Sequence, residues 1–589
     1  MALPQFGKTG GQAALAGGNG VHGNGGHESG VRGAGDGDGA AMNLVHCLLD
    51  RHLAEGRSDR PALRWLGHRH VRRDITYGEL NEQAARAACV LRDHGVEPGD
   101  VVAVMLPRIP ELYVAALGAW KVGAVFCPLF ASFGPGPVKS RLEVGRAKVL
   151  IASDSLYARK VAGNRALLSD LATVLLVGED GAATQGCDDG CADFRQLLAA
   201  ADPARGGTAA IGPDAPAWLH FTSGTAGIPK GALHAHRAAS PLRDSGRTVF
   251  GLRPDDVYWC TAEPGWITAT AYGIVAPLAN GCAIIVDNAE FDPRRWYSIL
   301  RDDAVTAWYT TPTAIRMMMR YGAALARSYR RNVLRVAASC GEPLNAEAVA
   351  WGERAFGVPF RDSWWQTETG AITIANLPDA SRPGSMGRAL PGFDVAVADC
   401  ATADLRFIDE PDRPGELVVR ADCPSLFTGY LGEDGRPMET FADGWYRSGD
   451  LVRRDADGFF WFLGRRDDII KSASQSIGPF EVEGALLDHP AVAEIGVVGR
   501  PDLLLREVPV AYVALNPGFE AGEALRLELL TFARQQLGPT LAPQEIHFID
   551  ALPKTSSGKI VRRALRLAAT GEVGETETLP LCAGRYDDE

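Results

Sequence analysis

The sequence predicts an α/β protein, with a large N-terminal domain of layered α/β subdomains and a small, mobile α+β C-terminal domain. Short apolar runs of strand length alternate with segments of helical periodicity, a pattern typical of layered and largely parallel sheets. The chain has 589 residues, of which 46% are hydrophobic and 22% are charged. Such a chain is too long for one domain and has the composition of a globular protein.

Shifts in composition divide the chain into four segments. Residues 1–41 are rich in glycine and poor in large apolar side chains. This stretch cannot bury enough surface to offset the entropy of ordering, so we expect a disordered tail. Residues 42–466 are expected to form the large domain, 467–570 the small domain after a hinge, and 571–589 a flexible polar tail. Met42 directly follows the glycine-rich stretch and is an alternative start of the chain.

Local patterns predict the elements of the two domains. In the large domain, Thr76 with Glu79 three residues later forms a capping box, and the helix that it begins is expected to end at Gly95. Apolar runs predict strands over 101–107, 125–130, 147–153, 173–178, 282–287 and 304–311, and a helix over 109–125. In the small domain, the patterns predict helices over 481–490 and 525–537, and strands over 493–499, 509–515 and 545–549.

Composition excludes several classes of function. The net charge of −12 and a pI of about 5.6 argue against a nucleic-acid partner. No apolar run is long enough for a membrane span, and the N-terminus lacks the pattern of a signal peptide. The 11 scattered cysteines indicate reduced thiols, so a cytoplasmic protein is expected. Cys187 and Cys191 have C-x3-C spacing but no second ligand pair nearby, and they are interpreted as loop cysteines.

The first segment with chemical character is FTSGTAGIPKGALHAH, residues 221–236. Glycines allow backbone N–H groups to approach phosphate oxygens, hydroxyls add donors, and a lysine adds positive charge. The spacing is not that of the Walker motif, because Ser-Gly-Thr precedes Pro-Lys-Gly. This segment is a candidate phosphate-binding loop, although an ordinary glycine-rich loop has the same composition.

The second segment is DSWWQTETGA, residues 362–371. A carboxylate flanked by hydroxyls suits Mg²⁺, which takes one or two carboxylates and fills its remaining positions with phosphate oxygens and water. One of the two adjacent tryptophans can line a pocket while its neighbour packs in the core. The alternative is that both tryptophans are core residues.

Two further segments carry polar groups that suit a nucleotide and its reaction. Asp450 follows Ser448-Gly449 and suits a ribose diol, while Arg465 suits a phosphate. Lys559 follows a Ser-Ser-Gly turn, which places it at a loop tip where it can neutralise charge that develops on a reacting carboxylate. In isolation, these stretches are more typical of a charged surface and of a solvated lysine.

Taken together, the four segments resemble the adenylate-forming superfamily of acyl-CoA synthetases and AMP-dependent ligases over about residues 43–570. The stretches 262–278, 339–348, 362–378 and 382–393 are most similar to the acetyl-CoA synthetases within it. The resemblance implies ATP, Mg²⁺ and CoA as cofactors or co-substrates, and a small carboxylate as the acid. It also implies that Lys559 is a site of regulation by acetylation.

The resemblance assigns roles to particular residues. Lys559, Glu368 and Thr367 would be catalytic, with Glu368 as the Mg²⁺ ligand and Lys559 bridging the carboxylate and the α-phosphate. Asp450 would hold the ribose hydroxyls, and Asp467 would be the hinge. ATP would be bound by Thr222, Ser223, Gly224, Thr225, Lys230, Gly341, Glu342, Pro343, Asp362, Ser363, Trp364, Gln366, Asp450 and Arg465.

The resemblance also implies where chain length is selected. Relatives that use acetate or propionate have a tryptophan where longer-chain members have glycine, and Trp365 occupies that position. A tryptophan buries on the order of 200 Å² and would fill a small acyl pocket. The other walls would be Trp266, Ile267, Thr268 and Cys340. One methylene is worth about 1–3 kcal/mol in such a pocket, so the expected acid is acetate or propionate, and the sequence does not distinguish the two.

One departure from the family concerns the acceptor. Relatives have a Ser-Gly-aromatic-Arg run after the hinge, whereas this chain has Ala473, Ser474, Gln475 and Ser476. Ser474 adds a side chain where glycine lines the pantetheine tunnel, and Ser476 replaces a phosphate-binding arginine. Arg534 matches the arginine that meets the CoA phosphate. The sequence therefore predicts an AMP-forming short-chain acyl-CoA ligase, with transfer to a carrier-protein thiol or another acceptor as the alternative enzyme, and a degenerate binding or regulatory homologue as a third hypothesis.

Overall fold

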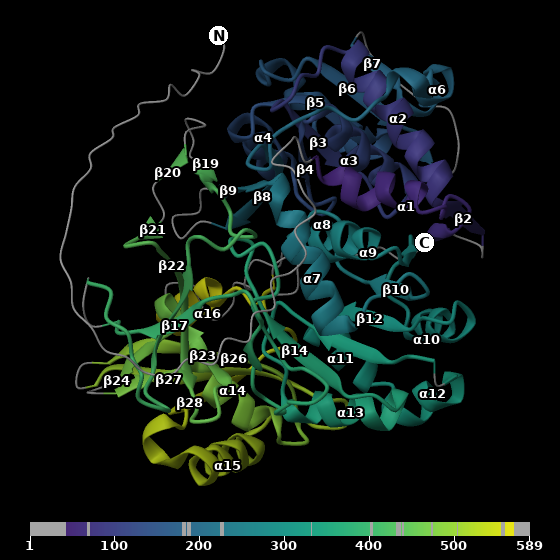
Figure 1. The fold of residues 1–589 in the computed structure, drawn as a ribbon. Helices are drawn as coiled ribbons and strands as arrows, with labels where there is room; N and C mark the ends of the chain where they lie inside the picture. The colour runs from purple at the N-terminus through teal and green to yellow at the C-terminus, as the bar shows by residue number, and fades with distance from the viewer. Residues whose placement is uncertain are drawn as a thin grey trace, which may run out of the picture. The chain divides into compact units, whose positions relative to one another are not determined.

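The structure is a computed structural model of the chain. It describes residues 43–67, 71–179, 184, 190–223, 229–331, 333–400, 404–431, 437–438, 441–472, 475–502, 505–554 and 560–570. The described residues all belong to one compact unit, Ala41–Glu589. Strands and helices alternate along most of this unit (Figure 1), which confirms the predicted α/β class.

Two large sheets of nine strands each are built from the described residues. The first has the order β16-β15-β14-β13-β12-β10-β11-β1-β2. Its central strands are parallel, and β2 and β15 pair antiparallel near its ends. Its strands are β1 (Pro61–Leu66), β2 (Arg72–Thr76), β10 (Val257–Cys260), β11 (Ala283–Asp287), β12 (Ala307–Thr310), β13 (Val336–Ser339), β14 (Phe360–Trp364), β15 (Ile374–Ala375) and β16 (Arg388–Ala389).

The second large sheet has the order β20-β19-β9-β8-β4-β3-β5-β6-β7. It is parallel from β8 to β7, while β9 and β19 extend it as antiparallel strands. Its strands are β3 (Val101–Met105), β4 (Val125–Pro128), β5 (Ala147–Ser153), β6 (Thr173–Val177), β7 (Cys191–Asp193), β8 (Pro216–Ser223), β9 (Pro229–Ala235), β19 (Gly429–Leu431) and β20 (Pro437–Met438).

Two smaller antiparallel sheets follow in the sequence. One contains β17 (Val395–Ala398), β18 (Gly415–Arg420), β21 (Phe441–Ala442), β22 (Trp445–Arg454) and β23 (Phe460–Arg465). The other contains β24 (Ile470–Ser472), β25 (Gln475–Ile477), β26 (Val492–Asp502) and β27 (Arg506–Leu515), with β28 (Glu545–Phe548) parallel to β27. The described strands of this last sheet all follow Asp467, so the predicted domain boundary falls between two sheets.

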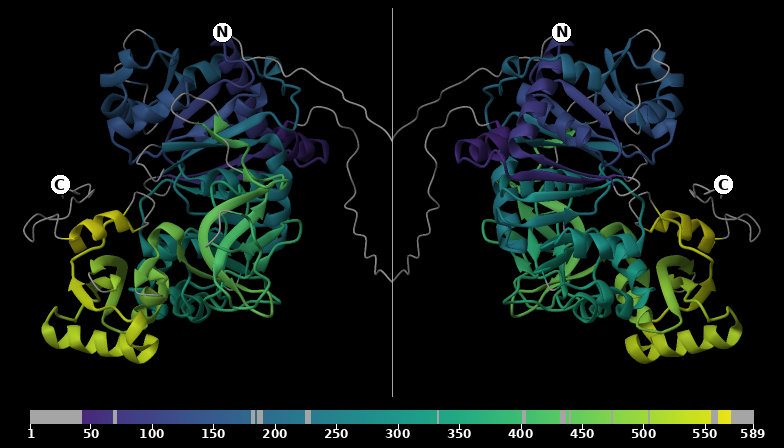
Figure 2. Two further views of the ribbon diagram at one scale, coloured as in Figure 1. Left: turned by 90° about the vertical axis from the view of Figure 1, so that its left-hand side faces the viewer. Right: turned by 90° about the vertical axis from the view of Figure 1, so that its right-hand side faces the viewer.

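Helices cover both faces of the two large sheets. The helices before Asp467 are α1 (Arg51–Ala54), α2 (Tyr77–Asp93), α3 (Pro110–Val122), α4 (Pro135–Val144), α5 (Asp154–Lys160), α6 (Phe194–Ala200), α7 (Ala239–Phe250), α8 (Ile267–Thr270), α9 (Ala276–Ala279), α10 (Pro293–Asp302), α11 (Pro312–Met319), α12 (Gly322–Tyr329) and α13 (Ala346–Phe356). Those after it are α14 (Pro479–Leu487), α15 (Glu523–Leu541) and α16 (Arg562–Thr570). The long helix α15, at the yellow end of the colour bar, lies alongside the small sheet in both views of Figure 2 and buries Leu529 and Ala533 against it.

Alternate side chains along the strands of the large sheets contact the hydrophobic cores on opposite faces. Along β3, Val102 and Val104 enter the core that also contains α2, α3 and α7, whereas Ala103 and Met105 face the core under α4 and α5. Along β12, Tyr309 faces the first of these cores and Trp308 faces the opposite side, among residues of α10 and α13. Alternate side chains of a strand point to opposite faces, so each sheet is buried on both sides.

The local predictions for helices and strands are confirmed with small shifts at the ends. The capping box is present, because Thr76 Oγ1 accepts from Glu79 N and Glu79 Oε2 accepts from Thr76 N. Helix α2 ends at Asp93, and Gly95 follows with a positive φ of 74°. Along the described part of the chain, no helix combines the length and apolar character that crossing a bilayer requires.

Candidate active site

The sheet topology gathers the segments that the sequence analysis singled out. In open α/β sheets, ligands bind beyond the carboxyl ends of parallel strands. Cys340 to Pro343 follow β13 and Trp365 to Glu368 follow β14, which are neighbours in the first sheet, so residues far apart in the sequence meet at one edge of that sheet. The glycine-rich segment begins at the end of β8 and continues through β9, in the second sheet.

Asp450 is the centre of a buried polar cluster. Its Oδ2 accepts from Trp364 Nε1 at 2.8 Å and from Gln366 Nε2 at 2.8 Å, and its Oδ1 accepts from Arg465 Nη1 at 2.7 Å. Asp450 is 4% exposed. A carboxylate has about four acceptor positions, so the described donors leave one on Oδ1 for a further hydroxyl. The cluster thus unites four predicted residues, and an acceptor position that suits a ribose hydroxyl remains on Asp450.

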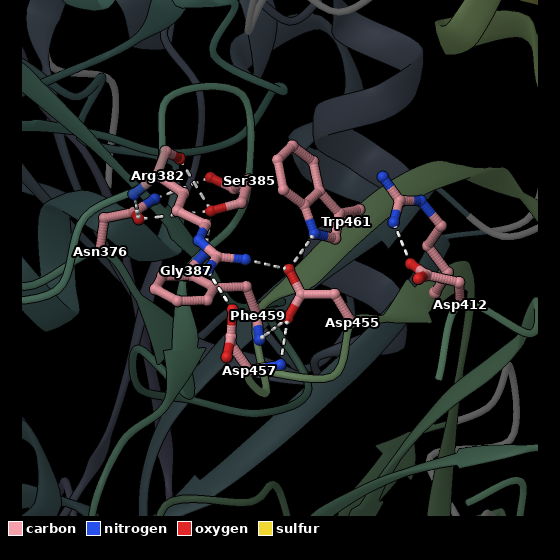
Figure 3. Close-up of polar contacts among 10 residues, drawn as sticks. Asn376, Arg382, Ser385, Gly387, Asp412, Asp455, Asp457, Phe459 and Trp461 are labelled. Atoms are coloured by element: carbon pink, nitrogen blue, oxygen red, sulfur yellow. Dashed lines mark hydrogen bonds and ion pairs between the residues drawn. The ribbon is translucent and has the colours of Figure 1, made fainter. Parts of the chain in front are cut away.

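The hairpin β22–β23 places this cluster. Asp450 and Arg465 face each other across its register, which is why residues 15 positions apart form an ion pair. The far end of the hairpin is fastened by Arg382, whose guanidinium donates to Asp455 at 2.7 Å and also to Asp457 (Figure 3). Trp461 Nε1 donates to the same Asp455 carboxylate at 3.0 Å. The hairpin is therefore held at both ends by charge-assisted hydrogen bonds.

Glu368 receives its partner from another sheet. Tyr430, in β19, donates its hydroxyl to Glu368 Oε1. Burial, followed by the charge of Glu368, raises the pKa of Tyr430 well above its ordinary value, so this hydroxyl stays protonated. Lys230 Nζ lies 5.3 Å from the centre of the Tyr430 ring. The candidate phosphate-binding lysine and the candidate metal ligand thus flank one tyrosine.

The donor set suits Mg²⁺ bound together with a nucleotide. Among the residues that the structure describes, no group of three or more His, Cys, Asp or Glu side chains could hold a metal. A single carboxylate fits an ion that takes its other ligands from phosphate oxygens and water. Glu368 has one oxygen bonded to Tyr430 and a second that can take such an ion.

The loop after β13 is shaped by Asp362. Its Oδ2 accepts from Leu344 N at 3.2 Å and its Oδ1 from Ser363 N at 2.9 Å. Burial raises the pKa of Asp362 to about 7. In the same loop, Glu342 pairs with Arg316 and accepts from Thr313 Oγ1 at 2.5 Å. Asp362 therefore anchors the backbone at Leu344, directly after the predicted adenine-binding residues Gly341, Glu342 and Pro343.

The predicted acyl-pocket residues lie together. Gly341 has φ +92°, and a Cβ added to it would lie 2.7 Å from the Trp266 ring, so the two segments are in close contact. Thr268 Oγ1 and Cys340 Sγ are 3.9 Å apart. Burial raises the pKa of Cys340 to about 11, so it remains a neutral thiol. Ile267, Cys340 and Trp365 belong to one buried cluster, with Trp266 packed against it.

The two tryptophans have separate surroundings. Trp364 packs among β17, β18 and β22, whereas Trp365 packs in the core that contains Tyr272 and Tyr309. Thr367 is fixed through its carbonyl, which lies 2.8 Å from His234 Nε2. Burial lowers the pKa of His234 to about 4, so the imidazole is neutral and we assign its proton to the shorter contact.

Several predicted residues are placed only in part or lie outside the described residues. Thr222 pairs with Lys230 across the β8–β9 ladder, and Ser223 ends β8. Arg534 is exposed on α15. The backbone of Asp467 lies in the short 3-10 segment Arg466–Asp468. Gly224, Thr225, Cys187, Ser474 and Lys559 lie outside the described residues.

Tyrosines that were not among the predicted site residues support the site. Tyr430 holds Glu368, and Tyr446 donates to Gln366 Oε1 at 2.9 Å. Trp365 Nε1 donates to Tyr309 Oη at 3.0 Å. The positions of these tyrosines in β19, β22 and β12 are typical of ordinary buried strand residues. A signal for Tyr309 was available, since it precedes the carboxyl end of a predicted parallel strand.

Comparison with known proteins places this geometry in a family. The AMP-binding enzyme family matches residues 50–431, and the AMP-binding enzyme C-terminal domain matches residues 481–559. The chain belongs to the AMP-binding enzyme family. It is 40% identical over 535 residues to acetyl-coenzyme A synthetase of Bacillus subtilis, covering 89% of this chain and 90% of that protein. It is 35% identical over 581 residues to acetyl-coenzyme A synthetase of Pyrobaculum aerophilum, covering 92% and 85%.

Comparison with solved structures supports the same family assignment. The chain is similar to the acyl-CoA synthetase of Brucella canis, with a TM-score of 0.68 and 36% identity over 91% of this chain and 95% of that one. It is also similar to the anthranilate CoA ligase AuaEII in complex with anthranoyl-AMP, with a TM-score of 0.81 and 26% identity over 90% and 97%. The resemblance inferred from the four motifs is thus confirmed.

Proposed function

We propose that the protein is an AMP-forming ligase that activates a short-chain carboxylate, acetate or propionate, with ATP and transfers the acyl group to CoA. The observation that carries the proposal is the meeting of Trp364, Gln366, Asp450 and Arg465 beside Glu368. The relatives named acetyl-coenzyme A synthetase extend over about nine tenths of the chain and support the same activity.

In the first half-reaction, a carboxylate oxygen attacks the α-phosphorus of ATP. The bond from that phosphorus to the bridging oxygen breaks, and pyrophosphate leaves. Positioning and electrostatics dominate such a step, because charge develops on phosphate oxygens. Asp450 orients the ribose, the loop from Gly341 to Pro343 lines the adenine, and Lys230 binds phosphates together with Thr222 and Ser223.

Glu368 would hold Mg²⁺, which would supply positive charge next to the phosphate oxygens. Tyr430 keeps the Glu368 carboxylate in one orientation by donating to one of its oxygens. Thr367, fixed through its carbonyl by His234, adds a donor next to Glu368. Lys559 supplies positive charge between the carboxylate and the α-phosphate, and acetylation of this lysine would remove that charge.

In the second half-reaction, the sulfur of CoA attacks the acyl carbon, AMP leaves as the C–O bond breaks, and the thiol proton is released. Arg534 would bind the phosphates of CoA. The run Ala473, Ser474, Gln475 and Ser476 motivates the second candidate, an adenylating enzyme whose acceptor is a carrier-protein thiol or another nucleophile. The relatives give that candidate no support, because the names of the similar proteins specify CoA.

The deciding experiment pairs ATP–pyrophosphate exchange with thioester formation. Exchange that depends on acetate or propionate, together with acyl-CoA product, is the expected result. Pyrophosphate exchange without formation of acyl-CoA would show that the acyl-adenylate forms but that the acceptor is not CoA. Absence of exchange with any acid would contradict the proposal and favour a binding or regulatory homologue.

Two variants test the assigned roles. Lys559→Gln should abolish exchange and spare thioester formation from supplied acyl-adenylate. Lys554→Gln is the matched control, because Lys554 pairs with Glu494 at 2.7 Å.

Trp365→Gly should open the pocket to longer acids, and an unchanged chain-length preference would contradict the pocket assignment.

A further inference from the structure

Trp365 is held in one orientation by two tyrosines. Its Nε1 donates to Tyr309 Oη at 3.0 Å. The ring of Tyr272 meets it edge-on, with centroids 5.1 Å apart and planes at 75°. All three residues are buried, so packing and hydrogen bonds determine the orientation of the indole.

The proton positions around Tyr309 are fixed by its partners. Ser363 Oγ donates to the carbonyl of Ser339 at 2.7 Å, and a carbonyl can only accept. Ser363 has then used its one proton, so it accepts from Tyr309 Oη at 2.8 Å. Tyr309 in turn has used its own proton, and its lone pair faces the indole N–H of Trp365. The chain of donors therefore has a single direction.

Tyr272 is locked in the same manner. Ser245 Oγ donates to the carbonyl of Leu242 at 3.1 Å and accepts from Tyr272 Oη at 2.8 Å. Tyr272 Oη also accepts from Ile372 N at 2.7 Å. The two tyrosine rings contact each other, with centroids 5.5 Å apart. Two rigid tyrosines thus enclose the indole, one by a hydrogen bond and one by ring packing.

We propose that Tyr309 is a positioning residue that determines acyl chain length by fixing the orientation of Trp365. The proposal rests on the proposed function, in which Trp365 closes the acyl pocket. Tyr309 acts through Trp365 and does not touch the acid. Strand alternation makes this possible, because β12 directs Tyr309 toward Trp365 and directs Trp308 to the opposite face.

Tyr309→Phe removes the acceptor for Trp365 and keeps the ring. The indole N–H would then be buried without an acceptor in that orientation. A buried donor without an acceptor costs free energy, which favours orientations of Trp365 in which the N–H finds another acceptor. We expect Trp365 to leave its position part of the time and to admit one or two more methylenes. The ratio of kcat/KM for butyrate to that for acetate should rise on the order of 10-fold, with KM for acetate raised and KM for ATP unchanged.

The matched control is Tyr258→Phe. Tyr258 is fully buried in the same core, and its hydroxyl has no hydrogen-bond partner among the described residues. Both Tyr258 and Tyr309 pack edge-on against Phe250, at 5.7 Å and 4.9 Å. The Tyr258→Phe variant should leave the butyrate-to-acetate ratio as in the parent chain.

A double-mutant cycle with Trp365→Gly separates the inference from the function on which it rests. If Tyr309 acts through Trp365, then Tyr309→Phe should change the ratio in the parent and leave it unchanged when Trp365→Gly is already present. A changed ratio for Trp365→Gly with no change for Tyr309→Phe would overturn the inference and leave the proposed function intact. An unchanged ratio in both would overturn the pocket assignment itself.

An equal fall in kcat/KM for all acids would assign Tyr309 a merely structural role, and a rise confined to KM for ATP would assign it a nucleotide-binding role. Either result would overturn the inference. If Tyr309→Phe does not fold, Ser363→Ala tests the same relay from one bond away, and only its butyrate-to-acetate ratio is compared because Ser363 is also a predicted ATP-binding residue. That variant frees the Tyr309 proton to rotate toward the indole, so the butyrate-to-acetate ratio should rise as well. An unchanged ratio in Ser363→Ala would also overturn the inference.

Discussion

At the scale of single residues, the site depends on carboxylates whose environments differ. Asp450 pairs with Arg465, Glu368 accepts from a tyrosine, and Asp362 is held by backbone N–H groups. Of these three, Asp362 has a pKa that burial raises to about 7. The same side-chain chemistry is therefore proposed to serve as a ribose acceptor in Asp450 and as a metal ligand in Glu368, while Asp362 anchors a loop.

The role of Asp450 can be tested by Asp450→Asn. The substitution removes the charge that pairs with Arg465 and replaces one acceptor oxygen by a donor. We expect kcat/KM for ATP in the exchange reaction to fall roughly 10- to 100-fold, because a hydrogen bond to a charged group is worth about 1.5–3 kcal/mol. Asp455→Asn, at the other end of the same hairpin, is the control for folding and should retain far more activity. Equal losses would contradict a role in nucleotide binding.

The raised pKa of Asp362 predicts a pH dependence of stability. In the unfolded chain this carboxyl ionises near its ordinary value of 3.8, whereas in the folded chain it keeps its proton to about pH 7. The folded state then binds more protons between these values, so the contribution of Asp362 to stability falls as pH rises from about 4 to 7.

Urea unfolding of the parent chain and of Asp362→Asn across this range measures the effect. The stability of the parent relative to that of Asp362→Asn should decline as pH rises, because the amide does not titrate. A difference that does not vary with pH would show that Asp362 is already ionised in the folded state.

At the scale of elements, the hairpin β22–β23 connects stability to the site. One end carries Asp450 and Arg465, and the other is fastened by Arg382 to Asp455 and Asp457. The guanidinium of Arg382 also lies 4.3 Å from the centre of the Phe459 ring. Because the two strands are paired in a defined register, fixing the turn end of the hairpin also fixes the position of the end that carries Asp450 and Arg465.

Arg382→Ala should destabilise the protein by about 1.5–3 kcal/mol, because it leaves the half-buried Asp455 without its cation. Thermal or urea unfolding measures the loss. The control is Arg301→Ala, whose pair with its neighbour Asp302 is exposed on both sides and should contribute about 0–1 kcal/mol. Equal effects of the two substitutions would contradict a structural role for the Arg382 cluster.

At the scale of the whole molecule, the predicted hinge is bordered by two anchored residues. Arg466 Nη1 lies 3.3 Å from the buried carboxylate of Glu416, before the hinge. Asp468 pairs with Arg566 and lies 4.0 Å from Arg562, both of which follow it. Each neighbour of Asp467 is therefore tied to its own side of the chain, which concentrates any rotation at that residue.

Asp467→Pro tests this arrangement, since proline restricts φ to about −65°. If the small domain rotates between the two half-reactions, pyrophosphate exchange should survive and acyl-CoA formation should fall by at least about tenfold, or the reverse if the fixed conformer suits the second step. Asp467→Ala keeps φ free and is the control. Loss of both half-reactions to the same degree would contradict rotation at this residue.

Local patterns in the sequence predicted much of the fold. The capping box at Thr76, the strand over Ala147–Ser153 and the helices of the small domain depend on interactions within a few residues, so they were readable without coordinates. The two nine-stranded sheets were not, because the pairing of β1 with β11, or of β9 with β19, joins segments far apart along the chain. The smaller sheet that carries Asp450 was not predicted as a separate layer.

The sequence by itself determined the family, the class of reaction and the identity of most candidate residues, because these are encoded in short motifs whose residue types the chemistry requires. Only the tertiary structure decided how those residues are held. Asp450 already carries three donors, Glu368 takes its partner from β19, and Trp365 is fixed through Tyr309. These contacts join strands that the sheet topology brings together, and local sequence carries no record of such long-range pairing.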